Sequence, residues 1–417
     1  MISLSCYILA DTYFIARELG ANGLAALNLA IPIYSFIFGG GLMLGIGGAT
    51  KYAIARSQNK VGDANRVYTN TAIIAAFLAA VFFIIGVFFS DVLARAFGAD
   101  EVVFEMTRIY LRIILLCAPL FILNSVLSSF IRNDGAPVLA MAAMISASFA
   151  NIAFDYLFIV LLQMGMFGAA LATGLAAVVG LVIKLTFFIR KKNNFRLIKC
   201  AITRKITLGI FSTGLPTFVT EVSAGAVIVT FNMIILGLQG NIGVAAYGVI
   251  ANISIVVISI YNGTAGGIQP LISRYYGSGD LKSAKMVLRY ALILVTVLSA
   301  AFYMIAFFGA SQIVAIFNSE NNPVLQSLAI SGIRIYFIAS VFIAFNIIIS
   351  IYLTSTENPR PAHFISLLRG FVLIIPMAIL LSSIGGMTGV WLAFPVTEII
   401  TCLLAVGILQ YTRKRLH

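Results

Sequence analysis

The chain has 417 residues, of which 61% are hydrophobic and only 10% charged, and its mean hydropathy is +1.05. A soluble core of this length cannot bury so much apolar surface, which excludes a soluble domain and makes lipid the solvent for most of the chain. The net charge of +13 does not indicate nucleic-acid binding, because the basic residues form short patches between apolar stretches.

Apolar stretches long enough to cross a bilayer follow one another along the chain. We expect helices, because these stretches are long and lack the alternating pattern of barrel strands. The first is short for a full span and has no signal-peptide features, so we expect the chain to begin inside its first membrane helix. The predicted spans are 1–16, 26–50, 68–90, 107–131, 138–162, 166–189, 207–236, 244–271, 287–310, 326–353, 362–383 and 387–411.

The loops predict the orientation of these spans. Lys and Arg gather in 51–66, 190–205, 272–289 and the tail after 411, whereas the intervening loops hold few basic residues and several acids. Basic loops face the cytoplasm. We therefore expect a multi-pass protein of the cell membrane with both termini in the cytoplasm.

The two halves of the sequence resemble each other. LGANGLAAL at 19–27 is similar to LQGNIGVAA at 238–246, and MFGAALA at 166–172 is similar to MTGVWLA at 387–393. Each half carries six spans, so both copies enter the membrane in the same direction. The sequence thus predicts an all-α protein of two six-helix lobes, 1–189 and 206–417, joined by a basic linker at 190–205.

A parallel repeat of this kind places a central cleft between its lobes, where transporters bind their substrates. Duplication for stability alone is the alternative explanation of the repeat. In a polytopic protein of this size, we expect transport.

Asn151 and Asp155 lie one helical turn apart in NIAFD, within an otherwise apolar span. An acid at membrane depth is costly and usually functional. The alternative is a structural role, in which Asn151 and the backbone satisfy Asp155 by hydrogen bonds.

Three motifs stand out in the sequence: ADTYFIARELG near the start, the Gly-Asp loops at 62–63 and 279–280, and NIAFD followed by GAALAT. At these spacings they resemble the multidrug and toxic compound extrusion (MATE) family. The resemblance covers nearly the whole chain. It implies an antiporter that exports amphipathic, often cationic, organic compounds in exchange for Na⁺ or H⁺, without a cofactor.

In one branch of that family, the amino-terminal lobe holds a cation site. The matching positions here are Asp11, Asn151, Asp155 and Thr173, and all four residue types are retained. The resemblance therefore implies that these residues bind the coupling ion. Thr173 and Asn151 could each instead bond across helices.

The positions of these residues along their spans agree with one shared site. Asp155 lies ten residues before the turn near Gly165 and Thr173 eight after it, which places both roughly 12–15 Å deep. Asp11 lies six residues before the expected end of its span, about 9 Å deep. Carboxylate, amide and hydroxyl oxygens suit Na⁺, and two neighbouring carboxyls make a proton an equally good occupant.

The second lobe lacks this set, because Phe394 takes the place of Thr173 and the span 326–353 has no acid. Glu221 is an intramembrane acid that could attract a cationic substrate. Asn124 and Asn346 are repeat mates that could line the cleft or bond across helices. We expect Glu398 to be neutralised by Arg369 in a buried pair.

Two other functions fit the sequence less well. A lipid or lipid-linked oligosaccharide flippase would share the two-lobed architecture, but it needs a basic cleft for a diphosphate, and few Arg or Lys lie mid-span. An intramembrane enzyme would need paired acids, a Ser/His set or metal ligands, none of which stands out. We expect a monomeric transporter of small organic cations that is surrounded by the lipid bilayer.

Overall fold

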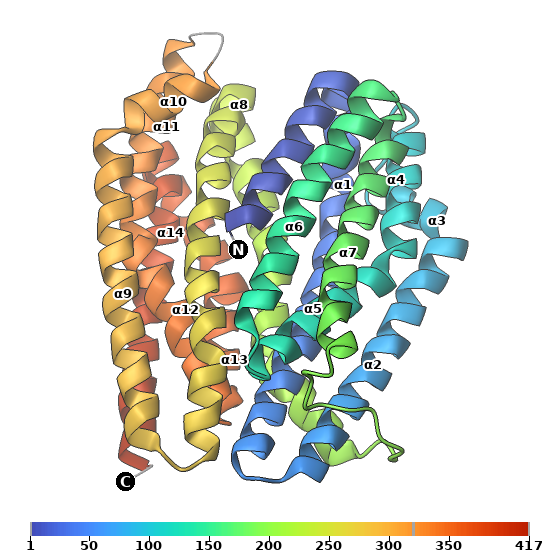
Figure 1. Cartoon of the computed structure of the whole chain (residues 1–417). Coiled ribbons are helices and arrows are strands. Elements are labelled where there is room, and N and C mark those ends of the chain that lie inside the picture. Colours follow the sequence, from blue (N-terminus) through green and yellow to red (C-terminus); the bar gives the residue numbers. More distant parts are fainter. Residues whose placement is uncertain (1, 319–321, 416–417) are drawn as a thin grey trace. The chain divides into compact units, whose positions relative to one another are not determined.

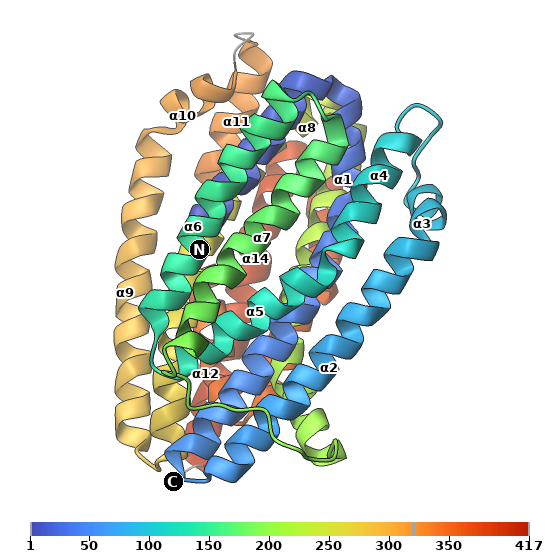
Figure 2. The ribbon, with the colours of Figure 1, turned by 45° about the vertical axis from the view of Figure 1, so that its right-hand side comes forward.

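The computed structural model describes residues 2–318 and 322–415, and helices dominate them. No β-strand occurs in those two ranges. The chain forms two compact units, residues 1–222 and 223–417. Figures 1 and 2 show long helices running the length of each unit.

Unit 1 holds the predicted spans of the first lobe. Its helices are α1 (Ile2–Ser57), α2 (Val61–Phe88), α3 (Ser90–Ala96), α4 (Phe104–Leu116), α5 (Ala118–Asn133), α6 (Pro137–Asp155), the π-helix η1 (Tyr156–Leu161) and α7 (Gly165–Ile189). The next helix, α8 (Arg204–Gly277), begins in unit 1 and continues into unit 2. The division between the units therefore falls inside α8, beyond the segment 190–205.

Unit 2 repeats this order of elements. It contains the rest of α8, followed by α9 (Leu281–Phe308), α10 (Ala310–Phe317), α11 (Pro323–Tyr336), the 3₁₀ turn η2 (Phe337–Ala339), α12 (Ser340–Ser355), α13 (Pro359–Leu367), the π-helix η3 (Leu368–Val372) and α14 (Ile374–Arg415). The short helices α3 and α10 occupy equivalent positions in the two repeats, after the long helices α2 and α9.

Glycines divide three of the long helices. Gly20 (φ 63°, ψ −154°) interrupts α1, Gly240 (φ 60°, ψ −154°) interrupts α8, and Gly386 (φ 54°, ψ −132°) interrupts α14. This backbone region is essentially reserved for glycine, because a Cβ atom would clash with the backbone. Gly20 and Gly240 lie at matching places in the repeat, so the two halves share the conformation of this bend as well as its sequence.

These breaks reconcile the helices with the predicted spans. Eight helical stretches are long and apolar enough to cross a membrane, or nine when α4 and α5, bent by 46°, count as one. Dividing α8 at Gly240 and α14 at Gly386, and adding the part of α1 before Gly20, gives twelve segments in the described part of the chain. The all-helical, twelve-segment prediction is confirmed.

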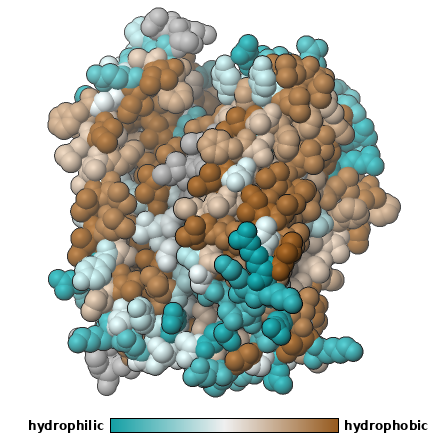
Figure 3. Space-filling view, viewed as in Figure 1, coloured by the Kyte–Doolittle hydropathy of each residue, from teal (hydrophilic) through white to brown (hydrophobic). Residues whose placement is uncertain are grey.

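Several large apolar side chains are exposed on the surfaces of the helices. Phe77, Phe88, Phe149 and Phe308 are each 69–77% exposed. Figure 3 shows hydrophobic surface over much of this view, with hydrophilic residues gathered toward the ends. Such a surface matches the apolar interior of a bilayer and would be costly in water.

The glycine-rich run 39–50 packs helices closely, because its residues are small. A Cβ atom on Gly45 would lie 2.8 Å from the Ser129 hydroxyl of α5, and one on Gly48 would lie 2.4 Å from the Thr71 hydroxyl of α2. One on Gly47 would lie 2.1 Å from the Ile210 carbonyl oxygen of α8. These contacts hold α2, α5 and the start of α8 against α1.

Candidate cation site

The four residues predicted to bind a cation come from three helices of unit 1. Asp11 lies in α1 before Gly20, Asn151 and Asp155 lie at the end of α6, and Thr173 lies in α7. All four side chains are buried, with Asn151 and Asp155 at most 1% exposed. The Asp11 and Asp155 carboxyls are close enough to interact electrostatically, so the structure brings the two acids together.

The depth of Asp11 differs from the sequence estimate. Its helical segment continues to Leu19 and bends at Gly20, so Asp11 lies nine residues from the bend rather than six from a helix end. At 1.5 Å per residue this is about 13 Å. Asp11 therefore falls within the range estimated for Asp155 and Thr173, which strengthens the case for one shared level.

The site holds polar atoms that no neighbouring group satisfies. Asp11 Oδ1, both carboxylate oxygens of Asp155, and both the nitrogen and the oxygen of the Asn151 side-chain amide are buried without a hydrogen-bond partner among the described residues. The alternative in which Asn151 satisfies Asp155 is therefore wrong. Thr173 is the exception, because its hydroxyl donates to the Ala169 carbonyl oxygen at 3.2 Å.

Unsatisfied oxygens at this depth are costly, and a bound cation would offset that cost. Two carboxylates, an amide and a hydroxyl form the all-oxygen set that hard cations prefer. The described residues contain no group of three or more His, Cys, Asp or Glu with metal-ligand geometry, so nothing in them resembles a transition-metal centre. The arrangement suits an ion such as Na⁺, or a proton shared by the two acids.

Asp155 occupies a junction in the backbone. It is the last residue of α6, and the π-helix η1 begins at the next residue, Tyr156. Short π-helical segments within α-helices are frequent at functional sites, because the extra residue shifts the side chains that follow. The corresponding span of unit 2 contains a second π-helix, η3, which includes Arg369.

Tyrosines extend the site beyond the predicted residues. Tyr110 of α4 pairs with the Thr173 side chain and interacts electrostatically with Asp11 and Asp155. The hydroxyls of Tyr7 and Tyr34, both in α1, lie 3.1 Å apart. Sequence reasoning missed these residues, and the available signal was a polar hydroxyl on an otherwise apolar span.

Glu221 lies on the part of α8 that packs on α1 in unit 1. A Cβ atom on Gly39 would lie 3.2 Å from the Glu221 Cβ atom, so the two helices approach closely at that point. Glu221 interacts electrostatically with Tyr34, which also interacts with Asp11. Tyr34 thus connects Glu221 to the cation site.

Asn124 and Asn346 both bond across helices. Lys184 of α7, which is 2% exposed, donates from Nζ to the side-chain and backbone oxygens of Asn124. In unit 2, Asn346 Nδ2 donates to Glu398 Oε2 at 2.7 Å and to the Glu398 carbonyl oxygen at 3.1 Å.

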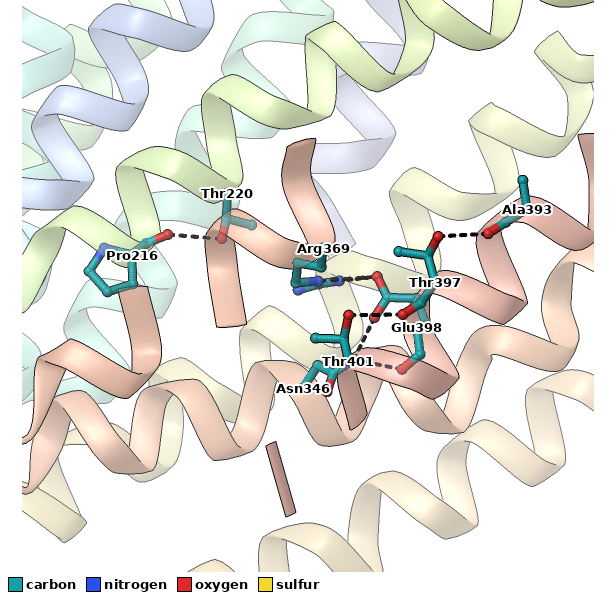
Figure 4. Close-up of polar contacts among 8 residues, drawn as sticks. All are labelled: Pro216, Thr220, Asn346, Arg369, Ala393, Thr397, Glu398 and Thr401. Atoms are coloured by element: carbon teal, nitrogen blue, oxygen red, sulfur yellow. Dashed lines mark hydrogen bonds and ion pairs between the residues drawn. The ribbon is translucent and has the colours of Figure 1, made fainter. Parts of the chain in front are cut away.

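The expected pair of Arg369 and Glu398 is confirmed. Arg369 donates from Nε and Nη2 to Glu398 Oε1 at 3.1 and 2.9 Å, and Glu398 is 1% exposed (Figure 4). Between them, Arg369 and Asn346 engage both oxygens of this carboxylate. The buried acid of unit 2 is therefore satisfied within the protein, in contrast to Asp155 in unit 1.

Comparison with known proteins agrees with these features. The model of the MatE family matches residues 1–157 and 216–380. The chain is similar to "Multidrug export protein MepA" of Staphylococcus saprophyticus, with 26% identity over 98% of this chain and 90% of that protein. A protein of the same name from Staphylococcus aureus strain MRSA252 has the same identity and coverage.

Solved structures share the fold. An outward-facing multidrug resistance MATE family transporter of the MOP superfamily superimposes with a TM-score of 0.92 at 24% identity, over 99% of this chain and 92% of that chain. A MATE in complex with MaL6 superimposes with a TM-score of 0.93 at 24% identity, over 100% of this chain and 93% of that chain.

Proposed function

Because the chain belongs to the MatE family, we propose that it exports amphipathic, often cationic, organic compounds in exchange for Na⁺ or H⁺. The observation that carries this proposal is the cluster of buried, unpartnered polar atoms on Asp11, Asn151 and Asp155. An internal structural role would leave those atoms hydrogen-bonded, as the Glu398 carboxylate is. A site that binds and releases an ion must leave these polar atoms without permanent hydrogen-bond partners.

The proposed membrane orientation follows from charge. The loops and ends that carry the Lys and Arg clusters face the cytoplasm of the cell membrane, as positive-inside topology predicts. The turn between η1 and α7 then faces outward. A cation arriving from outside would meet Asp11 and Asp155 at about half the depth of the bilayer.

Coupling requires that the ion and the substrate weaken each other's binding. Glu221 is the proposed substrate-attracting acid, because it is half-buried and not engaged by a cationic side chain in any ion pair of the described residues. A cation held by Asp11 and Asp155 would oppose a second positive charge near Glu221. Tyr34 interacts electrostatically with Asp11 and with Glu221, and so lies between the two sites. Typical coupling free energies of about 1–3 kcal/mol correspond to roughly 5- to 150-fold changes in affinity.

Alternating exposure of the site to the two sides of the membrane would complete the cycle. The substrate leaves outward when the cation binds, and the loaded carrier returns and releases the cation inside. A flippase for lipid diphosphates would instead need free cations at membrane depth. Arg369 is bound to Glu398 and Lys184 to Asn124, which disfavours that alternative.

The test is dye efflux from proteoliposomes that contain the purified protein and a fluorescent cationic dye. We expect efflux when a Na⁺ gradient or a pH gradient is imposed, and the effective gradient identifies the coupling ion. E221Q should weaken the response to cationic dyes more than to neutral ones. Wild-type protein that moves no dye under either gradient would overturn the proposal.

A further inference from the structure

The connection between α7 and α8 is fixed along unit 1 rather than free. We call residues 191–203 the strap. Three of its backbone N–H groups donate to side chains of α2, namely Arg196 to Asn65 at 3.0 Å, Ile198 to Thr69 at 3.1 Å and Thr203 to Asn70 at 3.1 Å. Figure 2 shows the strap crossing the lower ends of α1, α5 and α2.

A polar contact fixes the beginning of the strap. Asn194 donates to Asp134 twice, from its backbone N–H at 2.7 Å and from its side-chain Nδ2 at 3.2 Å. Asp134 also accepts from the Tyr52 hydroxyl of α1 at 2.5 Å. This carboxylate therefore joins α1, the end of α5 and the strap.

An aromatic contact fixes the next residue. Phe195 is fully buried, and five aromatic rings from four helices lie within 4.5–6.3 Å of its ring centroid: Tyr52, Tyr68, Phe130, Phe187 and Phe188. A buried phenylalanine side chain packed in this way contributes strongly to stability. The strap is thus held by its backbone, by Asn194 and by Phe195, and several of its other side chains are exposed.

The outward side of the strap is basic and apolar at once. Lys191, Lys192, Arg196 and Lys199 are exposed, and Leu197 and Ile202 between and beside them are 67% and 57% exposed. Figure 3 shows a hydrophilic patch in the lower part of unit 1, where Figure 1 draws the strap. Long cationic side chains next to exposed apolar ones fit the boundary between headgroups and acyl chains.

Charge around the strap has one sign. The segments 51–66, 132–137 and 190–205 together contain twelve Lys and Arg and two acids, Asp63 and Asp134. Asp134 is engaged by Tyr52 and Asn194, and Asp63 lies 3.5 Å from Arg66. The two acids offset only two of the twelve positive charges, so the surroundings of the strap remain strongly basic.

We propose that the strap is a binding surface for anionic phospholipid headgroups of the cytoplasmic leaflet. Phosphate oxygens would meet the four cations, while Leu197 and Ile202 reach the upper acyl region. The choice of the cytoplasmic leaflet rests on the orientation given under the proposed function. Lipid binding by the strap does not depend on transport activity. Because its backbone is already ordered, the strap loses little conformational entropy when lipid binds.

The test measures lipid-dependent thermal stability of the purified full chain in detergent, titrated with short-chain phosphatidylglycerol. Short-chain phosphatidylcholine and inorganic phosphate are titrated in parallel. Two triple variants remove equal charge: K192Q/R196Q/K199Q on the strap, and R274Q/K282Q/R289Q on the basic loop region between α8 and α9 of unit 2. We expect phosphatidylglycerol to stabilise the wild type and the loop variant, and its affinity for the strap variant to fall about tenfold or more.

The proposal is overturned by an equal loss of affinity in both triple variants, by an equal response to phosphatidylcholine, or by an equal response to inorganic phosphate. A stronger response to RNA than to phosphatidylglycerol would also overturn it. Integrity of the strap is checked separately by maleimide labelling of Cys200, the half-buried strap thiol that Asn70 Nδ2 contacts at 3.7 Å, in a C6A/C117A/C402A background. Unchanged labelling in the strap variant shows that the lost affinity reflects charge rather than unfolding.

Discussion

Asn124 and Asn346 hold buried charges of opposite sign at matching places in the two halves of the chain. The oxygens of Asn124 accept from the Lys184 ammonium, whereas the amide nitrogen of Asn346 donates to the Glu398 carboxylate. An asparagine amide carries both a donor and an acceptor, so the same residue can serve either charge. The repeat has thus kept its polar helix contacts while the charges that they hold diverged.

Replacing Asp155 with Asn should reduce gradient-driven dye efflux to near background, because one of the two carboxylates that attract the cation is lost. The melting temperature of the ion-free protein should stay equal or rise, since the wild-type carboxylate is buried without a hydrogen-bond partner. Proteoliposome efflux and thermal unfolding measure the two effects. D91N is the matched control, because Asp91 is exposed and its partner Arg108 lies 3.7 Å away. Undiminished efflux by D155N would refute the site.

Replacing Arg369 with Gln should cost about 3–5 kcal/mol of folding free energy, because it leaves the Glu398 carboxylate buried without its cation. The double variant R369Q/E398Q should lose less than the sum of the two single variants. Unfolding titrations in SDS measure all four proteins of the cycle. T397V is the control, since the Thr397 hydroxyl bonds only to the Ala393 carbonyl oxygen among the contacts drawn in Figure 4. Additive losses would mean that the pair is not coupled.

Replacing Gly240 with Ala should destabilise the protein by about 1–3 kcal/mol, because Ala cannot adopt φ 60° and ψ −154° without strain. Gly237 lies on the same helix, and a Cβ atom added at either glycine would meet no other atom within 4 Å, but the φ of Gly237 is not positive. G237A should therefore leave stability unchanged or slightly raise it, since Ala favours helix. Equal melting temperatures for G240A and G237A would contradict the prediction.

Asp280 should make stability depend on pH at the start of α9. Hydrogen bonds from the Ser283 side chain and backbone N–H, the latter at 2.9 Å, lower the pKa of this carboxyl below its usual value of 3.8. A lowered pKa in the folded state adds stability above the unfolded pKa, and that stability is lost as the pH falls through the folded pKa. The melting temperature of the wild type should thus drop below pH 4 by more than that of D280N, whose neutral cap does not titrate. Parallel curves for the two proteins would count against this cap.

The polar residues of the candidate site were easier to predict than their surroundings. Asn151 and Asp155 stood out because polar residues in an apolar span are rare, whereas Asp11 and Thr173 were added by the resemblance to the family. Tyr34 and Tyr110 were not recognisable, because a tyrosine on a membrane helix looks like any other aromatic residue until its neighbours are known. The π-helix after Asp155 was also missed, since a shift from i+4 to i+5 bonding leaves no periodic signal in the sequence.

Hydropathy predicted the helical fold, because backbone polar groups inside a bilayer must be hydrogen-bonded and a helix satisfies them within one segment. The strap could not be foreseen in this way. Its basic composition is that of a free linker, and only the three-dimensional positions of Asn65, Thr69 and Asn70 show what its backbone binds.

The Arg369–Glu398 pair has a consequence for the energetics of the two units. Unit 2 carries its counter-ion on its own chain, so its acid is neutralised at a constant local concentration that no gradient changes. Under the proposed function, unit 1 takes its counter-ion from solution, and the occupancy of Asp11 and Asp155 would follow the ion concentration on whichever side the site faces. Only unit 1 would then respond to an ion gradient across the membrane, whereas the neutralised acid of unit 2 would not.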